Sequence, residues 1–314
     1  MKIPSLSLLA AFGLAFAFPA AAQQFKMQTP AGEAPGPWIF GTIGVGRNPD
    51  KTVQNTALKG LAIKVGEKGE AAVAYDLDLC RMVGAWTGGK FTTPMNLMSR
   101  GEYPTAMGDV AFTTGEVAGF QIAKGEGAPE WKDPRSEPFG PLPDVKFRGM
   151  YKNGDKVVLK WDVAGTEVLE MPTYEEKDGI RWFVRSFEVH PHAGELHLAL
   201  GPGSGTVDQG GRSALKKPGY WSGLHVSKDG AVVFSRVVGS IDSFQYTYNG
   251  SHTGIALPAT NQVTRFAVQV TADGEKFPTT SSILTEAEAQ RLTASVSNIT
   301  PDLGALTKGS PAQW

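Results

Sequence analysis

The sequence predicts an all-β protein: an antiparallel β-sandwich with long Gly/Pro-rich loops and one short C-terminal helix. Three observations support this fold class. Apolar and polar residues alternate in several short runs, which is the pattern of half-buried strands. Asn-Gly and Asp-Gly pairs separate many of these runs and favour hairpin turns. The 38 glycines and 21 prolines are dispersed between the runs, so they indicate turns and not a low-complexity segment.

The first 22 residues have the form of a signal peptide. Lys2 supplies a positive start, residues 8–18 form an apolar run, and three alanines precede Gln23. Such small residues are accepted by a signal peptidase, and the apolar run is too short for a stable membrane span. We therefore expect a mature chain that begins near Gln23, has no membrane span and is exported to a periplasmic or extracellular location.

Composition limits the partners and the means of stabilisation. The chain has 30 basic and 31 acidic residues, which argues against a nucleic-acid partner, because phosphate backbones are bound by basic surfaces. Its single cysteine, Cys80, excludes an intrachain disulfide. Cys80 lies in an apolar, strand-like run at 77–83, and this position favours a buried free thiol over a reactive one.

Three segments follow the signal peptide. Residues 23–37 are polar and contain three prolines, which indicates a flexible leader. Residues 38–300 form the β-sandwich domain, either as one unit or as two β subdomains with a boundary near 124–144, where glycine and proline are frequent. Residues 301–314 are interpreted as a linker to a missing downstream module.

The clearest strand is predicted at Lys156–Val163. Val157, Leu159, Trp161 and Val163 alternate with polar residues, and Val158 is the one apolar exception. Two sheets are expected to pack face to face with Trp161 and Trp182 buried between them. Further strands are predicted at 145–151, 166–171, 180–189, 195–200 and 263–271.

Turns and one helix complete the expected elements. Asn153-Gly154 and Asp178-Gly179 lie between predicted strands and favour type I′ turns, in which both central residues have positive φ. Thr285 and Glu288 have the spacing of a capping box, which predicts a helix at about 285–294.

His190-Pro191-His192 is a weak candidate for metal binding. Histidines at i and i+2 of a strand share a face, and His197 is close in the next run, so three imidazoles could meet at a metal ion. The alternative is a solvent-facing strand end, because Pro191 interrupts the hydrogen-bond ladder. We favour this alternative and expect no metal site.

Aromatic residues in loops are the better candidates for ligand binding. Tyr220 and Trp221 follow a Gly-rich loop, and Trp131 lies in the other long loop. Exposed rings of this kind can stack on the apolar face of a sugar. We therefore expect a shallow glycan-binding site that contains Tyr220, Trp221 and Trp131.

The sequence offers no catalytic residue. Asp76 and Asp78 would share a face of a regular strand, as a glycosidase pair requires, but acidic pairs are inevitable among 31 acids and usually remain solvated surface charges. The chain has no Gly-x-Ser-x-Gly, P-loop or His-Glu-x-x-His motif. Nor does it have a Cys-x-x-Cys-His motif, which would attach a c-type haem. We therefore assign this segment no cofactor.

Several motifs taken together resemble a known bacterial family. The chain is similar, over about residues 36–200, to a domain of unknown function at the N-terminus of large exported proteins. In those proteins a sugar-dehydrogenase-like propeller follows, often with a c-type cytochrome module. The motifs are Lys59-Gly60-Leu61-Ala62-Ile63, Ala74-Tyr75-Asp76-Leu77-Asp78, Trp86-Thr87-Gly88-Gly89, Pro138-Phe139-Gly140-Pro141-Leu142-Pro143 and Tyr151-Lys152-Asn153-Gly154-Asp155.

The resemblance implies partners more than chemistry. It implies downstream propeller and cytochrome modules as partners, with haem c only in a longer chain that carries the cytochrome. Any dehydrogenase or electron-transfer activity would lie in those modules. Our leading interpretation is a non-catalytic N-terminal module of an exported, redox-associated protein that docks a glycan or a partner. The alternative is a stand-alone exported polysaccharide hydrolase that uses a carboxylate pair.

Overall fold

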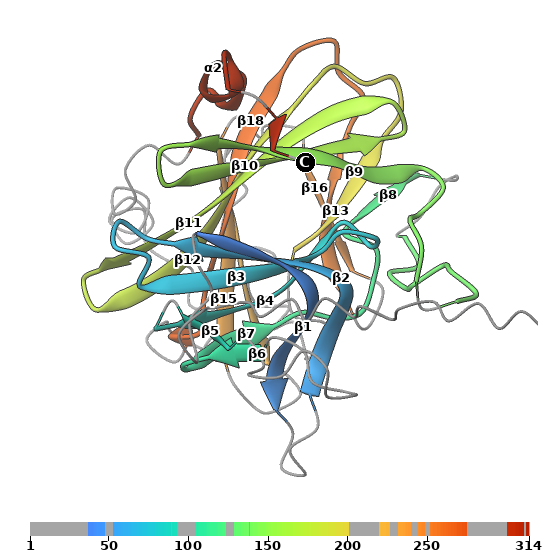
Figure 1. Cartoon of the computed structure of the whole chain (residues 1–314). Coiled ribbons are helices and arrows are strands. Elements are labelled where there is room, and N and C mark those ends of the chain that lie inside the picture. Colours follow the sequence, from blue (N-terminus) through green and yellow to red (C-terminus); the bar gives the residue numbers. More distant parts are fainter. Residues whose placement is uncertain are drawn as a thin grey trace, which may run out of the picture.

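In a computed structural model, the described residues are nearly all β, with several sheets and one short helix near the C-terminus (Figure 1). This confirms the predicted fold class. Within the described ranges no helix is long and apolar enough to cross a membrane. The structure describes residues 37–47, 53–88, 90–92, 105–123, 129–137, 139–200, 220–226, 232–239, 244–248, 252–274, 300–310 and 312–313.

The first sheet has seven strands in the order β5-β6-β1-β2-β3-β4-β7. Strands β1 to β4 form an antiparallel meander, and β6 pairs with β1 in parallel. The strands are β1 (Trp38–Arg47), β2 (Val53–Val65), β3 (Ala71–Asp76), β4 (Arg81–Thr87), β5 (Lys90–Thr92), β6 (Thr105–Met107) and β7 (Val110–Thr113).

The second sheet has eight strands in the order β14-β15-β18-β12-β11-β10-β9-β19, and all its pairs are antiparallel. Several of its bounds agree closely with the predicted strands. The strands are β9 (Val145–Asn153), β10 (Lys156–Val163), β11 (Thr166–Lys177), β12 (Ile180–Val189), β14 (Tyr220–Val226), β15 (Val232–Gly239), β18 (Thr264–Thr271) and β19 (Ala312–Gln313).

A third, smaller sheet has the order β16-β17-β13-β8. Its strands have only three to five residues each. They are β8 (Phe120–Ile122), β13 (Leu196–Ala199), β16 (Gln245–Tyr248) and β17 (Thr253–Leu257).

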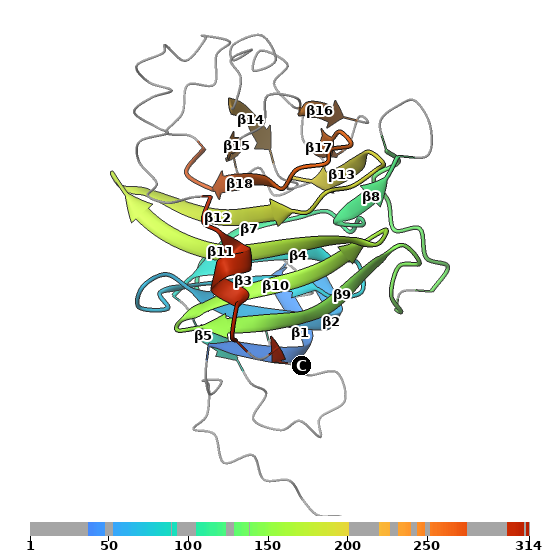
Figure 2. The ribbon, with the colours of Figure 1, turned by 90° about the horizontal axis from the view of Figure 1, so that it is seen from above.

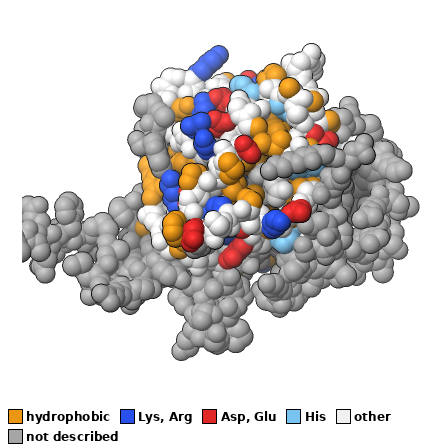
Figure 3. All heavy atoms as spheres, turned by 90° about the vertical axis from the view of Figure 1, so that its right-hand side faces the viewer, with side chains coloured by type: hydrophobic (Ala, Val, Ile, Leu, Met, Phe, Trp, Pro, Cys, Tyr) orange, Lys and Arg blue, Asp and Glu red, His pale blue; other side chains and the backbone are white. Residues whose placement is uncertain are grey.

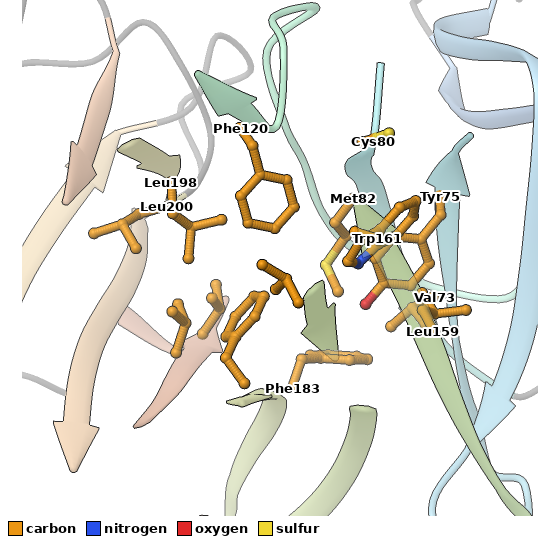
Figure 4. Packing of buried hydrophobic residues seen from close by; sticks show 14 of the residues in the cluster. Val73, Tyr75, Cys80, Met82, Phe120, Leu159, Trp161, Phe183, Leu198 and Leu200 are labelled. Carbon is orange, nitrogen blue, oxygen red and sulfur yellow. The ribbon is translucent and has the colours of Figure 1, made fainter. Parts of the chain in front are cut away.

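The first two sheets face one another and enclose the main core (Figures 1 and 2). Tyr75 of β3 contacts Trp161 of β10 with ring centroids 6.1 Å apart, and Phe112 of β7 meets Phe183 of β12 edge-on at 5.6 Å. Figure 4 shows Leu198 of β13 and Leu200, which follows β13, pointing into the same interior. Residues on both sides of the 124–144 segment therefore share one core.

Burial of the two tryptophans is confirmed, but only Trp161 lies between the sheets. Trp182 and Phe183 are neighbours on β12, so their side chains point to opposite faces. Phe183 contacts the first sheet, whereas Trp182 packs beside Phe234 and Arg236 of β15, within its own sheet. The expectation that Trp182 lies between the sheets is wrong, because strand alternation places it on the outer face.

The hairpin turns partly follow the predicted chemistry. Asp178 and Gly179 both have positive φ and lie between the paired residues Lys177 and Ile180, as a type I′ turn requires. At Asn153-Gly154 the turn is shifted by one residue. Asn153 pairs with Lys156, so the central residues are Gly154 and Asp155, and only Gly154 has positive φ.

The range interpreted as a linker, 301–314, is partly folded. Helix α2 (Leu303–Thr307) is capped by Asp302, whose side chain accepts the Ala305 N–H, and α2 lies across β9 to β12 (Figure 2). Buried Leu303 packs against Val158, which explains why that position of β10 is apolar. The helix predicted at 285–294 lies outside the described residues.

Cys80 is buried, as expected, but it does not lie in a strand. It is the last residue of the turn between β3 and β4 and has φ of 50°. Its carbonyl oxygen would lie only 1.9 Å from a Cβ at Gly119. The turn therefore packs directly against the backbone before β8, and burial raises the pKa of the Cys80 thiol.

Candidate functional site

One cavity lined by described residues lies where β12, β17 and β18 end or begin. Its volume is about 200 Å³, which is below the roughly 300–1,000 Å³ of pockets for drug-sized ligands. It can therefore hold one small ring, either alone or as one unit of a longer ligand. The lining residues are Val189, His192, Phe244, Leu257, Pro258, Ala259, Thr260 and Thr264.

Pro191 determines how the chain reaches this cavity. A proline has no N–H and cannot continue the ladder, and β12 ends at Val189. The chain then forms an isolated bridge in which His192 N–H donates to Thr260 O at 2.9 Å and Thr260 N–H donates to His192 O at 3.0 Å. This bridge fixes His192 and Thr260 side by side in the cavity wall.

The imidazole of His192 is oriented by a backbone carbonyl. Its Nδ1 lies 2.6 Å from Gly194 O. A carbonyl oxygen only accepts, so Nδ1 must carry the hydrogen, and in the neutral ring Nε2 is then an acceptor. His192 is buried, which corrects the expectation of a solvent-facing strand end: the bridge to Thr260 turns this residue inward after the proline.

Two threonines supply hydroxyl groups to the same cavity. Thr260 Oγ1 accepts the N–H of Gln262 at 3.1 Å, so a lone pair is used and the O–H remains able to donate. Thr264 begins β18 and also lines the wall. The cavity thus combines an imidazole acceptor with hydroxyl groups that can donate.

The apolar part of the wall is held by stacked aromatic rings. Phe244 meets Phe266 edge-on with centroids 5.0 Å apart, and Phe266 stacks on Phe187 at 5.0 Å. These contacts anchor the cavity to the main core. No Asp, Glu, Lys or Arg is among the eight lining residues, so the wall offers apolar contact and neutral hydrogen bonds.

The three histidines considered as possible metal ligands do not lie together. His190 Nε2 lies 3.5 Å from both Glu167 Oε1 and Glu188 Oε1, whereas His192 lines the cavity. His197 Nε2 lies 3.1 Å from Glu195 Oε1. Across the part of the chain that the structure describes, no three His, Cys, Asp or Glu side chains gather as metal ligands.

Trp131 does not fit the role of an exposed stacking platform. Its side chain is only 3 % exposed and meets the His197 ring edge-on at 6.4 Å. A Cβ at Gly254 would lie 2.1 Å from the indole Cζ2. The expectation that Trp131 is exposed is wrong. Gly254 of β17 has no side chain, and the indole of Trp131 packs into the space that a side chain would occupy.

Tyr220 and Trp221 begin β14, where they pair with Val238 and Val237 of β15. Their side chains lie outside the part of the structure that is described. Their proposed stacking on a sugar therefore stays a prediction. The sequence missed Phe244, Thr260 and Thr264, which are ordinary apolar and hydroxyl residues with no distinctive spacing.

Asp76 and Asp78 are buried within the fold. Asp76 Oδ1 accepts the N–H groups of Asp78 and Leu79 at 3.0 and 3.1 Å, and Asp78 Oδ2 accepts Gly140 N–H at 2.9 Å. Burial raises the pKa of Asp76, and nearby Arg81 opposes this shift. These contacts hold the β3–β4 turn and the following loop together, so the pair is not a solvated surface feature.

A hub of buried polar and charged side chains surrounds Glu170 of β11. This carboxylate accepts hydrogen bonds from Tyr75 (2.7 Å), Trp161 (2.9 Å) and Arg185 (2.6 Å). Burial is the main cause of the raised pKa of the Tyr75 hydroxyl. Beside Arg185 lies a second cavity of about 20 Å³, also lined by Arg81, which has room for about one water.

No curated protein matches the chain. Among solved structures, one similar protein is described provisionally as a kojibiose phosphorylase from human microbiome, with 11% sequence identity and a TM-score of 0.32. The alignment covers 79% of this chain and 36% of that protein, so the chain spans about a third of its length. A likeness this low carries no argument about function.

A protein-family model gives a more local match. It covers residues 73–170 and is described as Domain of unknown function (DUF6797). The match runs from β3 into β11, ends at Glu170 and lies inside the range for which we expected a domain of unknown function. The residues of the large cavity, between 189 and 264, lie outside it. The similarity to the domain of unknown function DUF6797 is thus confined to residues 73–170.

Proposed function

We propose that this chain is a non-catalytic docking module that binds a glycan through the cavity beside His192. The observation that carries the proposal is the composition of that cavity: an aromatic ring, an imidazole and two hydroxyl groups around about 200 Å³. An apolar wall with a few converging polar groups is the usual form of a small-molecule site. A sugar ring offers the matching surfaces, because its CH face is apolar and its hydroxyls both donate and accept.

The wider context is also part of the proposal. The apolar run at 8–18 and the alanines before Gln23 support export. The resemblance in sequence supports an N-terminal position in a redox-associated, multidomain protein with propeller and cytochrome modules. Mass spectrometry of the chain recovered from a bacterial periplasm tests the first point: a mature N-terminus near Gln23 is expected, and an intact Met1 would contradict it.

Affinity electrophoresis of the exported chain in gels that contain soluble polysaccharides tests docking. Retardation by at least one neutral glycan is expected. Phe244→Ala should abolish it, since Phe244 lines the cavity, with circular dichroism used to confirm that the variant is folded. Phe139→Ala is the matched control, because Phe139 is 62 % exposed and is not part of the wall.

Two results would contradict the proposal. One is the absence of retardation by every glycan, and the other is equal retardation of the wild-type chain and a folded Phe244→Ala variant. The hydrolase alternative is tested in the same gels by staining for shortened polysaccharide. Clearing that disappears in Asp78→Asn would favour that enzyme over a docking module, although Asp78 is occupied by Gly140 N–H and lies near Arg135 and Lys59.

A further inference from the structure

We infer that His192 makes the cavity selective for neutral sugars, by accepting a ligand hydroxyl at Nε2 while the described residues of the wall include no lysine or arginine for an acidic sugar. This inference rests on the proposed function and adds the class of sugar and the residue that selects it. Its basis is the fixed orientation of the imidazole and the charge of the groups around the cavity.

The imidazole is restrained on two sides. The backbone of His192 is fixed by the bridge to Thr260, and Nδ1 is held by Gly194 O at 2.6 Å. With Nδ1–H committed to that carbonyl, Nε2 is the ring nitrogen left for a ligand, and in the neutral ring it can only accept. The geometry therefore favours a ligand O–H and disfavours a carboxylate, which has no hydrogen to donate.

The hydroxyl of Thr260 offers the complementary contact. Its oxygen already accepts Gln262 N–H, so its hydrogen can be donated to a ligand oxygen. A group that donates to His192 and a neighbouring group that accepts from Thr260 are both supplied by adjacent sugar hydroxyls. Phe244 can cover an apolar CH face of the same ring.

Electrostatics argues against an anionic ligand. None of the lining residues carries a formal cationic group other than the histidine itself. The nearest arginine in sequence, Arg265, is engaged by Glu188 at 2.9 Å and by Asp302 at 3.0 Å. A buried carboxylate without a cation is costly. On the face shown in Figure 3, acidic and basic side chains are interspersed, without a dominant basic area.

Saturation-transfer NMR and calorimetry with single sugars test the inference. The ligands are methyl glycosides of neutral hexoses and the corresponding methyl uronosides, which differ only by a carboxylate at C6. The wild-type chain should bind at least one neutral glycoside and bind its uronoside at least tenfold more weakly. His192→Phe should weaken neutral binding about two- to tenfold, the loss expected for one hydrogen bond.

Two further variants separate selection from a general loss of structure. His192→Lys places a cation in the wall and should shift the preference towards the uronoside, a change that unfolding would not produce. His190→Gln is the matched control, since His190 is two residues away, lies between Glu167 and Glu188, and is not part of the wall. It should leave both affinities unchanged.

The outcomes distinguish this inference from the proposed function. If no sugar binds to the wild-type chain, both are overturned. If neutral glycosides bind but His192→Phe binds them equally well, or if the uronoside binds at least as tightly as the neutral sugar, docking stands and the selective role of His192 is overturned. Weaker binding of neutral glycosides by His192→Phe, together with a preference of His192→Lys for the uronoside, would support both the docking function and the selective role of His192.

Discussion

The hub around Glu170 and the cavity beside His192 are attached to the same core, but the hub lies within continuously paired strands and the cavity lies where strands end or begin. Around Glu170, β10, β11 and β12 have 8 to 12 residues and pair along most of their length. Around His192, β12 ends and β18 begins, β17 has only five residues, and an isolated bridge replaces a strand. The long ladders bury charge in a closed interface, whereas the strand ends leave an opening.

Strand length has a physical consequence for each region. Long paired strands bring side chains into continuous contact, so Tyr75, Trp161 and Arg185 reach Glu170 together and satisfy both its oxygens. Where the hydrogen-bond ladders between strands stop, opposing side chains are no longer held in contact. A space lined by the ends of strands remains there. We therefore expect substitutions to change stability most at the hub and binding most at the cavity.

The largest expected effect is at the hub. Glu170→Gln leaves the buried Arg185 without its carboxylate and turns an amide N–H₂ towards groups that donate. It should lower the free energy of unfolding by about 3–5 kcal/mol, the cost of breaking a buried ion pair. Urea unfolding measures this. Glu167→Gln on the same strand is the control: its partly exposed pair with Lys160 should contribute less than about 1 kcal/mol.

The next effect tests how tightly the small sheet packs against the loop that carries Trp131. Gly254→Ala would place a Cβ 2.1 Å from the indole and 2.8 Å from Leu198 O, so it should destabilise the fold by about 1–3 kcal/mol. Gly194→Ala serves as the control, because nothing lies within 4 Å of its Cβ position. Equal melting temperatures for the two variants would show that the loop adjusts freely.

A smaller effect depends on pH and involves His197. Burial lowers the pKa of His197, and Glu195 only partly opposes this. As pH falls below the ordinary value of about 6.5, the unfolded chain takes up a proton that the folded chain does not. Stability conferred by the neutral ring is therefore present above that value and lost towards the lowered folded pKa, at no more than about 1.4 kcal/mol per pH unit.

Urea titrations at several pH values measure this slope. His197→Gln should flatten the part of the slope that lies between about pH 7 and pH 5. An unchanged slope in this variant would mean that His197 takes up its proton in the folded state as well.

The smallest effect on stability is expected in the cavity wall. Thr264→Val keeps the shape of the side chain and removes a partly exposed hydroxyl, so the free energy of unfolding should change by less than about 0.5 kcal/mol. Retardation by a glycan should nevertheless decrease. A large loss of stability would instead place Thr264 with the structural residues, and the contrast between the two regions would be weaker.

The sequence predicted the long-stranded region better than the cavity. The bounds of β10 follow from alternation, the start of β12 follows from the Asp178-Gly179 turn, and the burial of Trp161 follows from its neighbours Leu159 and Val163 on one face. Local pattern decides these features. Even here the local pattern did not predict the turn after Asn153 correctly. The pairing of Asn153 with Lys156 makes Gly154 and Asp155 the central residues of that turn.

The cavity could not be predicted, since its wall comes from separate segments between 189 and 264. The histidines were noticed for their i, i+2 spacing, but that spacing implies a shared face only in a continuing strand, and β12 ends before Pro191. Trp131 was misjudged because its burial depends on Gly254, more than a hundred residues later. Such complementarity between distant segments has no local signature.

The C-terminal cover on the eight-stranded sheet also has a consequence for folding order. Helix α2 shields the apolar patch of Val158, Leu169 and Met171, and Asn153 Nδ2 donates to Leu306 O across 153 positions of sequence. β19 closes part of the β9 edge at Met150 and Tyr151. During synthesis or translocation, this patch and edge stay uncovered until residues 303–313 emerge, so nascent chains pass through a stage that is open to association with other strands.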